Sequence, residues 1–351
     1  MTQTHTIGRD SEKEFLSRSI TNGESSLLVG PWYRGKSHLA SCVTEGLSGQ
    51  QITPIYFNCM NGYTEQSFLE QYSKQILKSM SSKVKNIFED SQKYLPNIRP
   101  KISMNSVQGV DIKIDYHISQ KDIKQFLAEA IEIPNRIYQN TGEKMVIILD
   151  EYHSLLEIKE LGISEMIAKS IKPGVFYVFM SSKAKELDQI LPKKILSKIG
   201  IKARLDLGKI PSNILYFYLE NNFKDHDIKP TAAVIDKILS SMDGEIAFIN
   251  ILLAQLIEKG RFFKRVSLMD ISGALKEIVN LREDMFYHAF GALSAHQKGL
   301  IISTAREGGA QVFKGDFIYQ NGLVSVPSVQ TSITALIKKN FIHKENGAYI
   351  I

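Results

Sequence analysis

The residues best suited to chemistry lie in one short segment, Gly30-Pro31-Trp32-Tyr33-Arg34-Gly35-Lys36-Ser37, which fits the pattern G-x-x-x-x-G-K-[ST]. An apolar stretch, Ser25–Val29, precedes the segment, and a helix-forming stretch, Lys36–Gly46, follows it. In this setting glycine lets backbone N–H groups wrap closely around phosphate oxygens, and the N-terminus of the helix adds positive potential. A full match to the pattern between a strand and a helix rarely arises by chance, so the sequence predicts a phosphate-binding loop.

Side chains of this segment predict which parts of a nucleotide it holds. Lys36 supplies a positive charge for β- and γ-phosphates, and Ser37 offers the hydroxyl oxygen that Mg²⁺ prefers. For Trp32, the only tryptophan of the chain, we expect a ring packed on neighbouring apolar surface. Arg34 could contact a partner, although the sequence supports this role only weakly. We expect the nucleotide to contact the whole loop and the next residue, namely Gly30, Pro31, Trp32, Tyr33, Arg34, Gly35, Lys36, Ser37 and His38.

An acidic pair, Asp150 and Glu151, directly follows the apolar run Met145–Leu149. A continuous apolar run of this kind is typical of a strand buried on both faces of a parallel sheet. At the end of such a strand Asp150 can hold the Mg²⁺ shell, and Glu151 can act as a general base on an attacking water. An acidic pair alone more often marks a solvated loop, but beside a phosphate loop the catalytic interpretation is stronger.

Two serines, Ser181 and Ser182, end another apolar run, Val175–Met180. The carboxyl edge of a parallel sheet is where ligands bind, so one of these hydroxyls could contact the γ-phosphate or the attacking water. The sequence leaves open which serine does so. The alternative is that both merely cap a helix that starts at Lys183.

The elements that must position these groups alternate between strand and helix patterns up to about Leu207. This alternation predicts βαβ units and a parallel sheet covered by helices. Val110–Tyr116 alternates apolar and charged residues and predicts a half-buried strand in a hairpin or edge insertion. Pro134 is expected to bend or restart a helix. Further segments are a strand at Ile52–Phe57, a helix with Leu69, Tyr72, Ile76 and Met80 on one face, a helix with Ile123, Phe126, Leu127 and Ala130 on one face, and a strand at Ala203–Leu207.

Composition narrows the class of protein. The chain has 351 residues, of which 43% are hydrophobic and 23% charged, so it can bury a core and is not a disordered chain. Two cysteines exclude a disulfide scaffold, and no apolar run is long enough for a membrane helix. The polar N-terminus lacks a secretion signal, so we expect a cytoplasmic protein without membrane contact. The net charge of +6 permits contact with nucleic acid without arguing for it.

These motifs, in this order, resemble those of an AAA+ ATPase, and most closely the archaeal-type ATPase family, a relative of the STAND and origin-recognition branches. Ile7–Glu14 resembles the opening segment of that family, which implies that Ile7, Gly8 and Arg9 lie near the adenine. Met180–Leu187 is similar to the family's strand end and following helix. Asp243–Phe248 is similar to the start of a helix in its lid.

The C-terminal part resembles the winged helix of the same family. Leu293–Lys298 and Ser325–Gln330 match the starts of two of its helices, and Phe341–Lys344 and Gly347–Ile350 match its wing. The resemblance implies an α/β fold whose P-loop NTPase parallel sheet forms an AAA+ core, followed by an α-helical lid and a C-terminal winged-helix domain. The boundaries it implies are 1–208 for the core, 209–291 for the lid and 292–351 for the winged helix. ATP and Mg²⁺ are the implied ligands.

The chain also departs from this family. Lys193–Lys198 stands where the family has an arginine ahead of the fifth strand, although Lys198 could supply a point charge there. Ile246 stands where the lid motif often has proline.

Three functions therefore stay open. The chain could be an ATP-hydrolysing molecular switch, an ATP-regulated DNA-binding protein with negligible turnover, or a subunit that acts on a partner protein in trans, with homo-oligomers also expected. For DNA contact the candidates are polar and basic residues of a helix over Ser328–Asn340, namely Gln330, Thr331, Ser332, Thr334, Lys338 and Lys339.

Overall fold

The computed structural model describes residues 6–47, 51–62, 64–81, 100–105, 109–114, 120–158, 162–339, 341–345 and 347–351. The chain divides into two compact units, Met1–Ile271 and Ser272–Ile351. None of the described helices is both long enough and apolar enough to cross a membrane.

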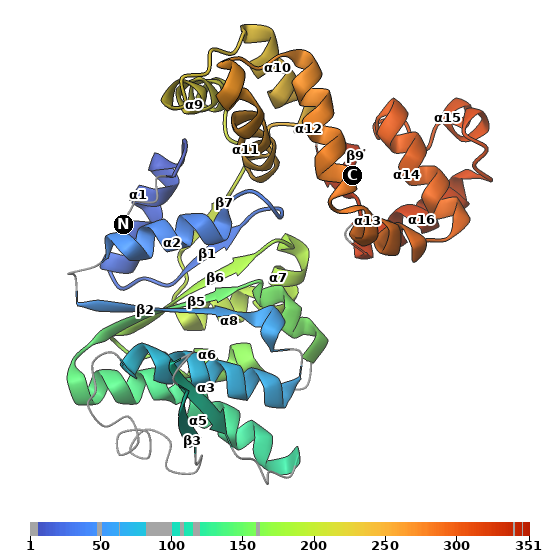
Figure 1. The fold of residues 1–351 in the computed structure, drawn as a ribbon. Helices are drawn as coiled ribbons and strands as arrows, with labels where there is room; N and C mark the ends of the chain where they lie inside the picture. The colour runs from blue at the N-terminus through green and yellow to red at the C-terminus, as the bar shows by residue number, and fades with distance from the viewer. Residues whose placement is uncertain are drawn as a thin grey trace. The chain divides into compact units, whose positions relative to one another are not determined.

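The first unit is built on a five-stranded sheet with the strand order β2-β5-β6-β1-β7 (Figure 1). Every pair of neighbouring strands is parallel, which confirms the predicted parallel sheet. Crossover connections therefore bring the carboxyl ends of all these strands to one edge. The strands are β1 (Ser26–Val29), β2 (Ile52–Asn58), β5 (Lys144–Asp150), β6 (Val175–Ser181) and β7 (Ala203–Asp206).

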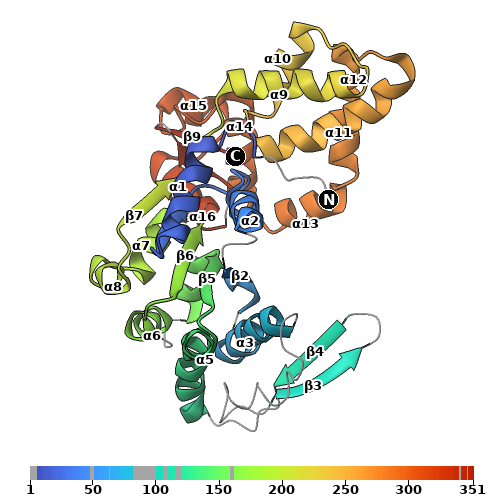
Figure 2. The same cartoon turned by 90° about the vertical axis from the view of Figure 1, so that its left-hand side faces the viewer.

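Helices cover both faces of this sheet (Figures 1 and 2). On one face α1 (Asp10–Thr21) and α2 (Lys36–Gly46) bury Val146 and Ile148 of β5. On the other face Met145, Ile147 and Leu149 of the same strand lie in a second core. The double burial explains why β5 is apolar at successive positions. The helices of that second face are α3 (Glu65–Ser81), α5 (Gln120–Thr141), α6 (Ile163–Ser170), α7 (Ala184–Ile190) and α8 (Lys193–Ile199).

Helix α5 runs through Pro134 as one element, so it does not restart there, which was one of the two predicted outcomes. A proline inside a helix removes one backbone hydrogen bond and costs about 3 kcal/mol. Here the buried residues Leu127, Ile131 and Ile137 hold the helix in the core on both sides of the proline. Tertiary packing of this apolar face outweighs the local cost.

A two-stranded antiparallel hairpin is inserted between α3 and α5. Its strands are β3 (Pro100–Asn105) and β4 (Gly109–Ile114), with Ile102 opposite Ile112. This confirms the hairpin that the alternating pattern predicts, except for Asp115 and Tyr116, which lie outside the described residues. Two short 3₁₀ segments, η1 (Cys59–Asn61) and η2 (Tyr152–Ile158), follow β2 and β5.

Helices alone follow β7 in the rest of the first unit. They are α9 (Ser212–Asp225), α10 (Ala232–Ser241), α11 (Ile246–Phe263) and the start of α12 (Leu268–Asn280). The predicted apolar stripe of α11 is buried, with Ile249, Leu252, Leu253 and Leu256 each at most 3% exposed. This helical part lies within the segment 209–291 that the sequence predicts as a lid, and it is called the lid below.

The second unit has its own core, and from Ala295 onward it contains the three helices and the terminal hairpin that the sequence predicts for 292–351. Its helices are α13 (Glu283–Gly291), α14 (Ala295–Glu307), α15 (Gly315–Gln320) and α16 (Val326–Lys338), and its hairpin is β8 (His343–Glu345) with β9 (Ala348–Ile350). Leu300, Val329 and Leu336 are among the buried residues that hold the helices together.

Helix α16 begins at Val326, earlier than the predicted Ser328, because the Ser325 hydroxyl accepts the Ser328 N–H and Pro327 fits the first turn. Asn340, the predicted end of this helix, lies outside the described residues.

Candidate functional site

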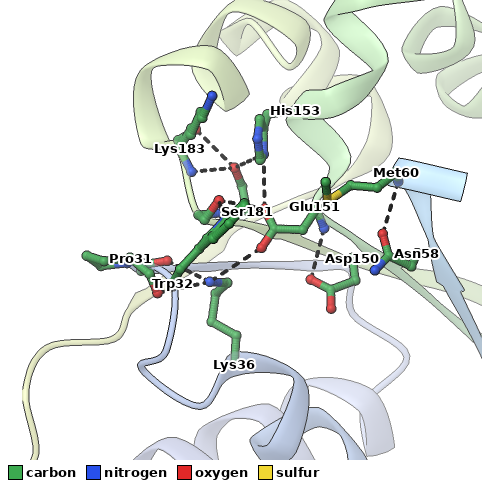
Figure 3. A network of polar contacts seen from close by, with 12 residues as sticks. Pro31, Trp32, Lys36, Asn58, Met60, Asp150, Glu151, His153, Ser181 and Lys183 are labelled. Atoms are coloured by element: carbon green, nitrogen blue, oxygen red, sulfur yellow. Dashed lines mark hydrogen bonds and ion pairs between the residues drawn. The ribbon is translucent and has the colours of Figure 1, made fainter. Parts of the chain in front are cut away.

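The predicted phosphate loop joins β1 to α2, at the carboxyl edge of the sheet (Figure 3). Gly35 is the N-cap of α2 and has a φ of 84°, in the left-handed region that favours glycine. At Gly30 the limit is space, because a Cβ there would lie 2.9 Å from the backbone oxygen of Leu207. Each glycine of the motif is thus required by a different geometric constraint.

Lys36 is folded back over this loop. Its Nζ donates to the backbone oxygens of Gly30 at 2.8 Å and Pro31 at 3.1 Å, and it lies 3.7 Å from Oε1 of Glu151. Burial lowers the pKa of Lys36, and the carboxylates of Glu151 and Asp150 oppose that shift. The ammonium group is therefore desolvated and surrounded by acceptors, as a group that binds phosphate oxygens would be.

The two residues expected to hold Mg²⁺ are in contact. The Ser37 hydroxyl donates to Oδ2 of Asp150 at 2.7 Å, and the Asp150 side chain is buried. The other carboxylate oxygen, Oδ1, accepts the N–H of Glu151 at 2.9 Å. A hydroxyl beside a carboxylate is the oxygen donor set that suits Mg²⁺, so these residues fit the ion.

Tyr56 is a member of this site that the sequence did not reveal. Its hydroxyl donates to the same Oδ2 of Asp150. Burial and the Asp150 carboxylate both raise the pKa of Tyr56, so the group stays a donor. The register of the sheet explains the contact, because Tyr56 lies on β2 opposite Ile148, two positions before Asp150.

Glu151 is bound on both sides by polar groups (Figure 3). Its Oε2 accepts from the Ser182 hydroxyl at 2.6 Å and from the Ser182 N–H at 3.1 Å, and lies 3.3 Å from Nδ1 of His153. Its backbone has a φ of 49°, a value that non-glycine residues rarely adopt. Since such outliers cluster at functional sites, the conformation supports the interpretation of Glu151 as a reacting group.

Ser181 and Ser182 point to different surroundings. Ser181 is fully buried; its hydroxyl lies 3.0 Å from Nδ1 of His153 and accepts the N–H of Lys183. Ser182 faces Glu151. Helix α7 starts at Ala184 with Lys183 as its N-cap and without a side-chain cap, so the alternative that both serines cap this helix is wrong. His153 is a second contact of the site that sequence reasoning missed.

The Trp32 ring contacts the neighbouring Tyr33 ring edge-on, with centroids 6.4 Å apart, and it also makes a polar contact that the sequence did not predict. It is 40% exposed, and its Nε1–H donates to the hydroxyl of Ser182. The reason is the position of the loop above the edge of the sheet, where strand ends present polar groups.

The next two loop residues contact the lid. Nη2 of Arg34 lies 2.9 Å from Oε1 of Glu245, the N-cap of α11, and the ring centroid of Tyr33 lies 4.7 Å from that of Phe248. The Arg34 guanidinium thus binds a lid carboxylate. In this structure the lid is attached to the phosphate loop itself.

The N-terminal segment closes another side of the site. Nη2 of Arg9 donates to the backbone oxygens of Gly208 at 2.6 Å and Arg34 at 3.4 Å. Gly8 has a φ of 56°, and a Cβ there would lie 2.8 Å from Ile214 of α9. Between this segment, the loop and the lid lies a cavity of 380 Å³. Apolar residues line part of it (Ile7, Ile210, Ile246, Ala247) and polar ones another part (Lys36, Ser37, His38, Glu151).

The comparisons with known proteins concern the fold and the C-terminal domain. Residues 284–351 match the family model described as a probable winged helix domain. No curated protein sequence matches the chain.

Among solved structures, a Walker-type ATPase of Pyrococcus abyssi is 15% identical with a TM-score of 0.65, and the match covers 99% of this chain and 93% of that one. The ORC1 protein of Aeropyrum pernix, solved in complex with DNA, is 16% identical with a TM-score of 0.57 over 98% of this chain and 87% of its own. Cdc6p from Pyrobaculum aerophilum is 11% identical with a TM-score of 0.52, over 99% and 90%. The chain therefore has the P-loop ATPase fold of these structures, and its C-terminal residues match a winged-helix domain.

Proposed function

We propose that this chain is a cytoplasmic, Mg²⁺-dependent ATPase that couples the state of its nucleotide to its winged-helix domain, as a molecular switch. The observation that carries the proposal is the meeting of Lys36, the Ser37–Asp150 pair and Glu151 at one edge of the sheet, beside the cavity. The proposed parts are a nucleotide-binding core at 1–208, a lid at 209–291 and a winged helix at 292–351.

In this proposal different residues bind different parts of the nucleotide and the metal ion. The apolar part of the cavity, with Ile7 and Ile210, suits the base, and Lys36 with the loop N–H groups suits the phosphates. Ser37 and Asp150 would hold Mg²⁺, which when bound neutralises charge on the β- and γ-phosphates.

Glu151 takes the proton of the attacking water in this proposal. The water oxygen bonds to the γ-phosphorus, the bond to the β,γ-bridging oxygen breaks, and ADP leaves with the electron pair. The hydroxyl and the backbone N–H of Ser182 both donate to Oε2 of Glu151 and hold the carboxylate in place for this step.

The test separates binding from turnover. Lys36→Ala should abolish ATP binding measured by calorimetry, while Glu151→Gln should keep binding and lose phosphate release. Lys169→Ala, a change at an exposed lysine of α6, is the matched control and should leave both unchanged. Unchanged ATP affinity in Lys36→Ala would show that the proposal is wrong.

A second candidate is an ATP-regulated DNA-binding protein with negligible turnover. The winged-helix match and the ORC1 protein solved with DNA favour it. In α16 the side chains of Gln330, Thr331 and Thr334 are exposed, but Ser332 is buried, with its hydroxyl 2.8 Å from Nδ1 of His296. Ser332 is therefore no longer a candidate for DNA contact. Affinity for duplex DNA that falls steeply with salt, without phosphate release, would favour this function.

A further inference from the structure

A chain of hydrogen bonds joins the phosphate loop to the proposed general base. Trp32 Nε1–H donates to the Ser182 hydroxyl, and the Ser182 hydroxyl donates to Oε2 of Glu151 at 2.6 Å. The three residues come from the loop after β1, the end of β6 and the end of β5. The chain of contacts therefore crosses the edge of the sheet where the proposed reaction occurs.

The direction of these hydrogen bonds is fixed by chemistry. An indole N–H can only donate, a hydroxyl has one proton to give, and an ionised carboxylate can only accept. Because Trp32 occupies a lone pair of Ser182, the single hydroxyl proton of Ser182 is directed to Glu151. Without Trp32 the hydroxyl would be free to turn away from the carboxylate.

The lysine of the same loop contacts both parts of this chain. Lys36 Nζ bonds to the backbone oxygen of Pro31, the residue directly before Trp32, and lies 3.7 Å from Glu151. A triphosphate that takes Lys36 as its partner removes the bond to Pro31 and changes the surroundings of Trp32. One ammonium group thus connects the occupancy of the loop to both ends of the hydrogen-bond chain.

We propose that Trp32 is a positioning residue that ties occupancy of the phosphate loop to the orientation of Glu151 through Ser182. The proposal rests on the proposed ATPase function. When a γ-phosphate takes Lys36 from Pro31, the Trp32–Ser182–Glu151 chain holds the Glu151 carboxylate in place to accept the proton of the water. With ADP, Lys36 stays on Pro31 and the surroundings of Trp32 do not change.

The first experiment uses the unaltered protein, because Trp32 is its only tryptophan and indole emission reports on this ring alone. Emission is recorded during titration with a non-hydrolysable ATP analogue and with ADP, and calorimetry on the same samples establishes binding. We expect the emission to change with the triphosphate and to stay unchanged with ADP. Bound triphosphate without a change in emission, or the same change with ADP, would overturn the proposal, whereas absence of binding would refute the proposed function.

The second experiment is a double-mutant cycle on turnover. Trp32→Phe keeps a ring and removes the donor, and we expect kcat to fall about tenfold with KM unchanged, the effect of one lost hydrogen bond to a charged network. Tyr319→Phe removes a hydroxyl from an exposed ring of the second unit and should leave kcat unchanged.

Ser182→Ala combined with Trp32→Phe should reduce kcat no further than Ser182→Ala alone, because both changes break the same chain of contacts. Fully additive effects, or an unchanged kcat in Trp32→Phe, would contradict a positioning role.

Discussion

Arg34 of the phosphate loop and Glu245 of the lid form an ion pair, with Nη2 and Oε1 2.9 Å apart and side chains 4% and 15% exposed. Glu245 is also the N-cap of α11, where the helix dipole favours a carboxylate. The pair therefore joins the start of a lid helix to the loop that the nucleotide would occupy. A change in the loop can reach the lid through this contact without passing through the sheet.

We expect Glu245→Ala to destabilise the first unit by about 3 kcal/mol, because it leaves the buried Arg34 guanidinium without its carboxylate. Urea unfolding followed by circular dichroism measures the loss. The control is Asp243→Asn, which removes the exposed ion pair of Asp243 with Lys209 and should cost less than about 1 kcal/mol. If the free energy of unfolding fell equally in the two variants, burial of the Arg34–Glu245 pair would contribute nothing to the stability of the first unit.

Tyr56→Phe should raise the Mg²⁺ concentration needed for half-maximal phosphate release about tenfold. The hydroxyl of Tyr56 orients Asp150, and loss of such a contact typically weakens metal binding by at least this factor. A titration of phosphate release against Mg²⁺ checks the shift, with the exposed Tyr287→Phe as control. An unchanged Mg²⁺ requirement in Tyr56→Phe would remove Tyr56 from the proposed site.

His153 predicts how stability depends on pH. Burial lowers the pKa of His153 below its ordinary value of 6.5, although the Glu151 carboxylate opposes the shift. The unfolded chain then binds the proton more readily than the folded chain does. The stability that neutral His153 contributes to the fold is therefore complete above pH 6.5 and is lost as the pH falls below 6.5. We measure the free energy of unfolding in urea at about pH 7.5 and at about pH 5.5. It should fall less between these two pH values in His153→Asn than in the unaltered protein. The same loss in both would contradict this account.

Gly309→Ala should destabilise the second unit by about 2–3 kcal/mol, as overpacking typically does. A Cβ at Gly309 would lie 1.8 Å from the backbone oxygen of Tyr349 in β9, and the N–H of Tyr349 donates to the oxygen of Gly309. Gly315→Ala is the matched control, since no atom lies within 4 Å of its added Cβ. Thermal unfolding compares the two, and equal midpoints would show that β9 can move away without cost.

Patterns contiguous in the chain made much of the fold and part of the site predictable. The loop Gly30–Ser37 carries its own geometry, because glycine conformation and helix start are local properties. The apolar run before Asp150 indicates burial on both faces, and a parallel sheet then brings Asp150 and Ser182 to the same edge. These inferences need only the order of residues and the period of the elements.

Only the tertiary structure decided which side chains meet within that edge. Trp32 and Ser182 are 150 positions apart, and Tyr56 and Asp150 are 94 apart. Such contacts depend on strand order, register and the rotation of each side chain, which no local pattern encodes. The Trp32–Ser182 contact and the continuous α5 through Pro134 have the same cause, since partners distant in sequence outweigh local preference. The sequence by itself therefore predicted a class of chemistry, and packing between distant segments determined which side chains meet at the proposed site.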